Sequence, residues 1–312
     1  MSVATKSDLG SQEPTVVGSP VEEVPAGKAR GEFLYFAVRS KKFLFSIGVL
    51  GILAILAIVG PMLDSADPLA YNSVPMMGPS TDAGYWLGST LNGQDVFAQF
   101  ANGLRATFFV GFLGGGIAAL VGMTIGFIAG YKGGWVDEML NMLTNIFLVI
   151  PTLAVLLVIA SYLPSDMRGV PFEAIFIGVT SWPWAARAIR AQTFSLRNRE
   201  FIDLARLSGR GGWKIIMQEI APNMSSYLFL TFILLFGGAI LIGASLDFIG
   251  LGPHEGYTLG LMMYESINNS ALTLGLWWWF IPPGVAITAC VGALYVMNVG
   301  LDEIFNPKLR EL

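Results

Sequence analysis

The residue types that carry most enzyme chemistry are scarce in this chain. Its 312 residues include one histidine, His254, and one cysteine, Cys290. This composition disfavours a His-rich metal site, a histidine-based catalytic cluster and a disulfide within the chain. The phosphate-binding pattern G-x-x-x-x-G-K-[ST] is absent, because Gly27-Lys28 lacks both the upstream glycine and the following Ser or Thr. We therefore expect no catalytic residue, no metal site and no ATP hydrolysis in this chain.

The side chains best suited to binding a partner are gathered in the segment REFIDLARLSGRGGWKIIMQEIAPN (199–223). Long stretches on either side carry almost no charge, whereas this segment holds Arg199, Glu200, Asp203, Arg206, Arg210, Lys214 and Glu219. The i, i+3, i+4, i+7 spacing of a helix face is followed by Phe201, Leu204, Ala205 and Ser208, with Leu207 beside them. The same apolar spacing returns at Trp213, Ile216, Met217 and Ile220, up to Pro222.

Between the two patterns, Gly209 stands where the end of a helix favours a residue that tolerates positive φ. The segment therefore predicts two short amphipathic helices joined at a glycine. Such a surface suits two kinds of binding. It can lie on lipid headgroups, or it can dock to a protein partner, and periodicity alone leaves both open.

The elements that must position this segment are apolar helices. The chain is 54% hydrophobic and 13% charged, with a mean hydropathy of +0.62, which is typical of a membrane protein. Because about 20 apolar residues cross the hydrocarbon core as a helix, we predict an all-α integral membrane protein with six transmembrane helices. The six stretches are residues 43–63, 104–130, 138–162, 173–191, 224–249 and 276–300.

The distribution of Lys and Arg predicts the orientation of these spans. With the N-terminus inside, all of the 18 Lys and Arg residues except Arg105 and Arg168 fall on the inner side. The outer loop, residues 64–103, carries four aspartates and no Lys or Arg. We expect a multi-pass protein of the cell membrane with both termini and the charged segment in the cytoplasm.

Three regions are predicted along the chain. Residues 1–31 are rich in Ser, Pro, Gly, Val and Glu without an apolar period, and we expect a disordered cytoplasmic tail. Residues 32–103 hold the first transmembrane helix and a compact extracellular segment. Residues 104–312 hold the remaining five helices.

With the preceding SWPWAARAIRAQTFSLRNRE, the charged segment resembles the cytoplasmic loop of binding-protein-dependent ABC importer permeases. Glu200 matches the glutamate of that motif, Leu204 and Ala205 fall on its Ala-Ala, Gly209 on its glycine and Pro222-Asn223 on its Pro-Asn. The resemblance implies the type I ABC importer permease fold, with coupling helices between the fourth and fifth spans. It assigns ATPase coupling to Glu200, Phe201, Asp203, Leu204, Ala205, Arg206, Gly209 and Arg210.

Four further segments narrow the resemblance to the second permease subunit of the dipeptide, oligopeptide and nickel family. They are YWLGSTLNGQDVFAQF (85–100), AGYKGGWVDEML (129–140), SLDFIGLG (245–252) and FNPKLR (305–310). The chain departs from the family pattern at Leu204, Glu219, Tyr85 or Trp86, Gln94, Asp302 and Asn306. These departures leave the solute open: peptides are expected first, with oligosaccharides or nickel as alternatives.

The family resemblance also implies the partners. We expect a heterodimer with a homologous permease, one or two ATP-binding subunits that hold ATP and magnesium, an extracellular solute-binding protein and the lipid membrane, and no nucleic acid. No cofactor is expected in this chain itself. Contacts with the solute-binding protein are predicted at Asp82, Trp86 and Asp95.

A different class, the ion-coupled secondary transporter, usually carries ionisable groups at mid-membrane. The acidic residues Glu173 and Asp247 fall near the outer ends of predicted spans instead, so this alternative is disfavoured. A membrane-embedded enzyme would need clustered His, Asp or Glu. The polar residues left as pore candidates are Asn141, Asn145 and Ser181.

Overall fold

The computed structural model describes residues 35–64, 66–71, 73–80, 85–164, 167–254 and 256–305. The tail predicted at 1–31, Asp82 and residues 306–310 of the FNPKLR segment lie outside these ranges. Within these ranges the regular secondary structure is helical, apart from two isolated β-bridges. The predicted all-α class is confirmed.

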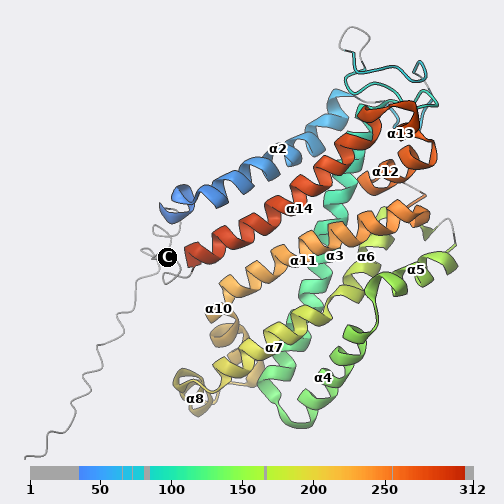
Figure 1. Cartoon of the computed structure of the whole chain (residues 1–312). Coiled ribbons are helices and arrows are strands. Elements are labelled where there is room, and N and C mark those ends of the chain that lie inside the picture. The colour runs from blue at the N-terminus through green and yellow to red at the C-terminus, as the bar shows by residue number, and fades with distance from the viewer. Residues whose placement is uncertain are drawn as a thin grey trace, which may run out of the picture.

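Four helices are long and apolar enough to cross a membrane. They are α2 (Lys41–Leu63), α3 (Val96–Lys132), α11 (Ser225–Leu246) continued by the π-helical η3 (Asp247–Leu251), and α14 (Trp277–Phe305). They correspond to the first, second, fifth and sixth predicted stretches. In Figure 1, α2, α14 and α11 run roughly parallel, with α14 between the other two, and α3 crosses behind them.

The third and fourth predicted spans are each divided. α4 (Gly134–Val149) and α5 (Thr152–Tyr162) are bent by 77° at Ile150-Pro151, and they pass as a span only when taken together. α6 (Val170–Ser181) is apolar but has only 12 residues, and α7 (Pro183–Arg197) follows it directly. By length and composition, the described residues therefore hold four candidate spans, or five when the bent pair counts as one.

The second span begins earlier than the sequence predicted. α3 starts at Val96 and not at residue 104, because the Asp95 carboxylate caps its first turn. Asp95 Oδ1 accepts hydrogen bonds from the backbone N–H groups of Phe97 at 2.7 Å and Ala98 at 3.1 Å. The division predicted between residues 103 and 104 consequently falls inside this helix.

α3 is the central helix and packs against α7, α11, α6 and α2. Its glycines allow close approach: a Cβ added at Gly126 would lie 2.8 Å from the Ala186 carbonyl oxygen, and one at Gly130 would lie 2.7 Å from the Arg190 carbonyl oxygen. Small residues at four-residue spacing bring helix backbones together in this way. The position of α7 is thereby tied closely to α3.

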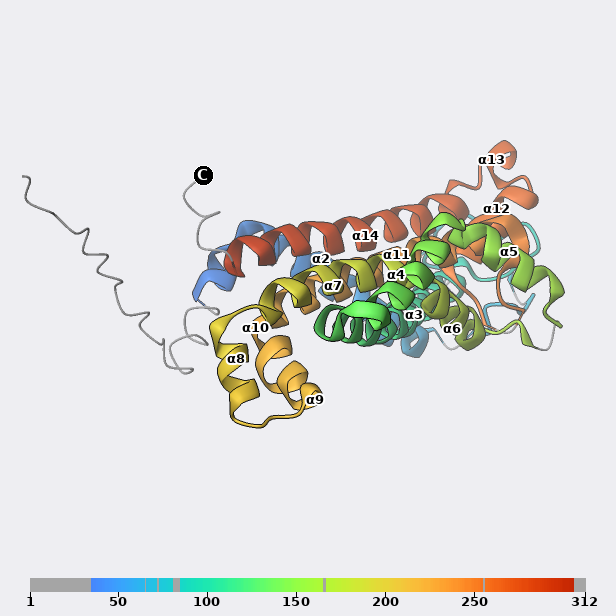
Figure 2. The ribbon, with the colours of Figure 1, turned by 90° about the horizontal axis from the view of Figure 1, so that it is seen from below.

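The short elements gather at the two ends of the bundle (Figures 1 and 2). One end holds α8 (Glu200–Leu207), α9 (Gly212–Ile215), the π-helical η2 (Ile216–Ile220) and α10 (Ala221–Asn223). The other end holds the described part of residues 64–95 with α12 (Leu259–Asn268) and α13 (Ala271–Leu274). There the indole N–H of Trp278 donates to the Ser89 carbonyl oxygen at 3.1 Å, which ties the 64–95 segment to α14.

Candidate functional site

The charged segment folds back on itself as two short arms, which we call the hairpin (residues 199–223). Gly209, which follows α8, has φ of 73°. Its N–H donates to the Arg206 carbonyl oxygen at 2.9 Å, and the N–H of Arg210 donates to that of Ala205 at 3.2 Å. These two bonds are the Schellman arrangement that ends a helix with a left-handed residue. The prediction made for Gly209 is confirmed.

The buried face of α8 differs from the predicted stripe. Ile202 is fully buried and Ala205 nearly so, whereas Leu204 is 64% exposed and Leu207 84% exposed. Leu204 and Leu207 of the predicted stripe are therefore open to a partner, and Ile202, which the stripe did not include, packs inward. A helix of eight residues offers two overlapping apolar faces, and the neighbouring helices decide which of them is covered.

The second arm is anchored by isoleucines. Ile215, Ile216 and Ile220 are buried, while Trp213 is 58% exposed and Met217 is also exposed. The second predicted stripe is thus divided: Ile216 and Ile220 pack inward, and Trp213 and Met217 are exposed. Pro222 does not end the run, because it lies inside α10. The buried side chains of both arms join one apolar cluster with Phe127 of α3 and Ala185, Ala186 and Ile189 of α7.

Tyr131, the last residue but one of α3, contacts both arms. A Cβ added at Gly212 would lie 2.8 Å from Cε1 of its ring, and the Arg206 guanidinium lies 5.7 Å from the ring centre. The backbone oxygen of Tyr131 also accepts a hydrogen bond from Arg197 Nη1 of α7 at 3.1 Å. The hairpin is therefore packed against the ends of α3 and α7.

The outward surface of the hairpin combines exposed apolar side chains with charges. Leu204, Leu207 and Trp213 project from it. Around them, Arg206 donates to Asp203 at 2.9 Å, and an ion pair links Arg210 of one arm to Glu219 of the other. Exposed leucine and tryptophan within a charged rim are typical of a surface that a partner covers.

The predicted coupling residues lie together on this hairpin, so the structure brings Glu200, Asp203, Arg206, Gly209 and Arg210 to one end of the molecule. Their role in coupling stays a prediction. Phe201 is half-buried and Ala205 packs inward. These two side chains therefore pack beneath the exposed surface of the hairpin and are less accessible to a partner.

The residues predicted to contact a solute-binding protein lie at the opposite end of the bundle. Trp86 is 45% exposed, and its ring packs edge-on against Phe97 at 4.8 Å between centroids. Asp95 is only 6% exposed, and burial raises the pKa of its carboxyl group. Its hydrogen bonds to the first turn of α3 give Asp95 a structural role as the cap of that helix. Contact with a binding protein stays a prediction for both, and Trp86 has the more accessible side chain.

The predicted pore residues are not gathered in one place. Asn141 and Asn145 lie one helical turn apart on α4, and Asn145 Oδ1 accepts from Arg187 Nη2 of α7 at 2.5 Å. Ser181 ends α6, and its hydroxyl is buried without a hydrogen-bond partner among the described residues. Their part in permeation stays a prediction.

Sequence reasoning gave no role to two acidic residues that the structure buries. Glu173 of α6 is 9% exposed and Asp247 of η3 is 1% exposed. Both were predicted to lie near the outer ends of spans. The available signal was simply an acidic residue within an apolar stretch, which is a mark of function in membrane proteins.

Comparison with known proteins shows the family to which the chain is related. The family model described as "Binding-protein-dependent transport system inner membrane component" matches residues 122–311, a range that includes the hairpin. The chain is similar to the dipeptide transport system permease protein DppC of Alkalihalophilus pseudofirmus, with 30% identity over 261 residues, 82% of each chain. It is also similar to the oligopeptide transport system permease protein OppC of Mycobacterium tuberculosis, with 29% identity over 279 residues, 88% of this chain and 93% of the relative.

Proposed function

Because this chain belongs to the family of binding-protein-dependent transport system inner membrane components, we propose that it is a permease subunit of an ATP-driven importer of di- or oligopeptides. The observation that carries the proposal is the hairpin, which is anchored to α3 and α7 and presents an outward surface for a partner. The named relatives transport dipeptides or oligopeptides, which favours peptides over the oligosaccharide and nickel alternatives.

The proposal includes six spans with both termini in the cytoplasm. We count α4–α5 as the third span and α6–α7 as the fourth. In support of the latter, Trp182 between α6 and α7 keeps helical angles, φ −69° and ψ −24°, and Pro183 occupies the first turn of α7, where a missing N–H is tolerated. The orientation is supported by the basic residues at the hairpin end and by their absence from residues 64–95.

The proposed partners follow from the same family. The hairpin docks to an ATP-binding subunit that holds ATP and magnesium, a homologous permease completes the pathway, and a solute-binding protein delivers peptide at the opposite end. Since the isoleucines of the hairpin pack with α3 and α7, a push on Leu204 and Leu207 moves these helices as one body. An ion pair between Arg190 of α7 and Asp137 of α4, with Nη2 and Oδ2 2.6 Å apart, passes the motion to α4.

Uptake by the reconstituted importer tests the function. The chain is inserted into vesicles with the homologous permease, the ATP-binding subunits and the solute-binding protein, and uptake of labelled di- and tripeptides is measured. We expect uptake that requires both ATP and the binding protein. Uptake driven by an ion gradient without ATP would overturn the proposal, and uptake of an oligosaccharide or nickel in place of peptides would reassign the solute.

Accessibility of single cysteines separates docking from lipid contact. In a Cys290→Ala background, cysteine at Leu207 of the hairpin is labelled before and after addition of the ATP-binding subunits, with Asp67→Cys at the other end as the control. We expect labelling at residue 207 to fall and labelling at residue 67 to stay the same. Unchanged labelling at residue 207 would favour a hairpin that rests on lipid.

A further inference from the structure

An open groove lies where the beginning of α2 meets the end of α14 (Figure 1). Its empty volume is about 1010 Å³, including the part that opens to the surroundings. Arg39, Lys41 and Lys42 line the groove from the beginning of α2 and the residue before its cap, and Glu303 and Ile304 line it from α14. Three basic side chains therefore share one open space with a single acidic side chain.

Close packing of the two helices builds this groove. A Cβ added at Gly300 of α14 would lie 3.0 Å from the backbone nitrogen of Phe43, so a glycine is what lets α14 approach the first turn of α2. An ion pair between Lys42 and Glu303 joins the same two helices. The chain bends just before α2, because Ser40 has extended backbone angles, φ −77° and ψ 108°. The groove is therefore defined by helix packing and by the bend in the backbone.

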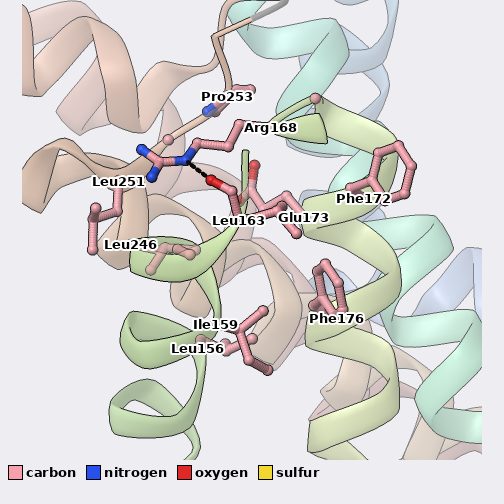
Figure 3. Close-up of a pocket in the computed structure, with 13 residues that line it drawn as sticks. Leu156, Ile159, Leu163, Arg168, Phe172, Glu173, Phe176, Leu246, Leu251 and Pro253 are labelled. Atoms are coloured by element: carbon pink, nitrogen blue, oxygen red, sulfur yellow. Dashed lines mark hydrogen bonds between the residues drawn. The ribbon is translucent and has the colours of Figure 1, made fainter. Parts of the chain in front are cut away.

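Two of the basic side chains have no acidic partner. Lys41 makes no hydrogen bond or ion pair with the residues that the structure describes. In the same ranges, the side chain of Arg39 bonds only to Tyr35: it donates to the phenol oxygen, and the guanidinium carbon lies 5.6 Å from the ring centre. By contrast, Arg168 donates to the Leu163 carbonyl oxygen at 3.1 Å (Figure 3). Arg39 and Lys41 are therefore available to an anion.

The position of the groove along α2 corresponds to the level of lipid headgroups. α2 is long and apolar enough to cross a membrane, and both of its basic residues lie in its first turn. Directly after them, Leu44, Phe45 and Ile47 are 47%, 63% and 46% exposed, which suits contact with acyl chains. Tyr35 is also exposed, and tyrosine is enriched at membrane interfaces. Basic residues beside a membrane span attract negatively charged headgroups.

We propose that this groove binds a phospholipid with a negatively charged headgroup. The phosphate lies against Arg39 and Lys41, and the acyl chains run along α2 over Leu44 and Phe45. A free phosphate ion would match the charge of the groove but not the apolar surface that continues from it. The inference goes beyond the proposed function, because it depends on α2 crossing a membrane and not on which solute is carried.

Equilibrium binding of lipid to the full chain in detergent tests the site. The probes are fluorescent phosphatidylglycerol and fluorescent phosphatidylcholine with the same acyl chains. Each basic side chain near a membrane surface strengthens the binding of an anionic lipid by about fivefold. We therefore expect phosphatidylglycerol to bind the unmodified chain about 10- to 25-fold more tightly than phosphatidylcholine. The double variant Arg39→Gln, Lys41→Gln is expected to lose this preference.

Two single lysine variants separate the groove from a general attraction to basic residues. Lys41→Gln should weaken phosphatidylglycerol binding by about fivefold. Lys132→Gln is the matched control, because Lys132 is also an exposed lysine, at the end of α3, and does not line the groove. It should leave the binding of both lipids unchanged. Equal weakening by the two substitutions would overturn a site at the groove.

Three other outcomes would contradict the proposal. Equal binding of the two lipids to the unmodified chain, or a preference that persists in the double variant, would mean that Arg39 and Lys41 hold no anionic lipid. Inorganic phosphate distinguishes the source of the phosphate group. At constant ionic strength, an equimolar amount should not displace phosphatidylglycerol, and displacement would identify a site for free phosphate in place of lipid.

Discussion

Gly212 of the hairpin packs against the ring of Tyr131 so closely that a Cβ at position 212 would lie 2.8 Å from Tyr131 Cε1. Tyr131 belongs to α3, the central helix, so this contact joins the second arm of the hairpin, which begins with α9, to the core of the bundle. A side chain at position 212 would force either the Tyr131 ring or the arm to move. Since the proposed function depends on a hairpin that moves with α3 and α7, this contact is a direct place to test coupling.

Gly212→Val is expected to separate ATP hydrolysis from transport. The added side chain must displace the Tyr131 ring or the arm, at a cost of about 1–3 kcal/mol. We expect near-normal abundance in the membrane and a loss of peptide-stimulated ATPase activity, measured on the reconstituted importer. Gly211→Val is the control, because nothing lies within 4 Å of a Cβ at Gly211 and its φ of −67° suits any residue. Equal activity of the two variants would contradict this role of the Tyr131 contact.

Gly209→Val should disturb the turn between the arms. A β-branched residue at φ of 73° costs about 1 kcal/mol or more in backbone strain. Nothing lies within 4 Å of a Cβ here, so strain and not crowding is the cause. Capture of the ATP-binding subunit by the purified permease should fall in Gly209→Val and persist in Gly209→Asn, which tolerates the left-handed conformation. Equal loss in both would point to a requirement for glycine other than its φ.

Glu200→Lys is expected to weaken docking without affecting insertion. Glu200 is in the first turn of α8, where an acidic side chain favours the helix dipole by about 0.3–1 kcal/mol. The substitution reverses this interaction and also reverses the charge offered to the partner. Peptide uptake and ATPase stimulation should be lost together, with Glu200→Gln intermediate. Full coupling of Glu200→Lys would indicate that α8 rests on lipid and does not bind the ATP-binding subunit.

Ile202 and Leu207, both on α8, should respond in opposite ways to truncation. Ile202→Ala removes a fully buried side chain and is expected to destabilise the protein by about 2–5 kcal/mol, lowering the temperature of thermal unfolding in detergent. Leu207 is 84% exposed, so Leu207→Ala should leave thermal unfolding unchanged and weaken capture of the ATP-binding subunit. A stability loss in Leu207→Ala that matches Ile202→Ala would contradict the buried face described for α8.

Much of the molecule is already determined by its sequence. Apolar composition and the length of the apolar stretches predict helices that cross a membrane. The reason is that a helix satisfies its backbone hydrogen bonds within itself, as a segment in hydrocarbon must. The turn at Gly209 was predictable for a local reason, since few residue types adopt positive φ at a helix end. These properties depend on composition or on a few adjacent residues.

Burial and long-range pairing were decided only by the tertiary structure. The eight residues of α8 allow two apolar faces, and packing against α3 and α7 selected Ile202 over Leu204. Glu173 and Asp247 lie far apart in the sequence, and only the packing of α6 against α11, which continues into η3, makes them buried neighbours. Whether an acidic side chain meets water or another acid depends on which helices enclose it. Hydropathy along the sequence does not predict such contacts between distant residues.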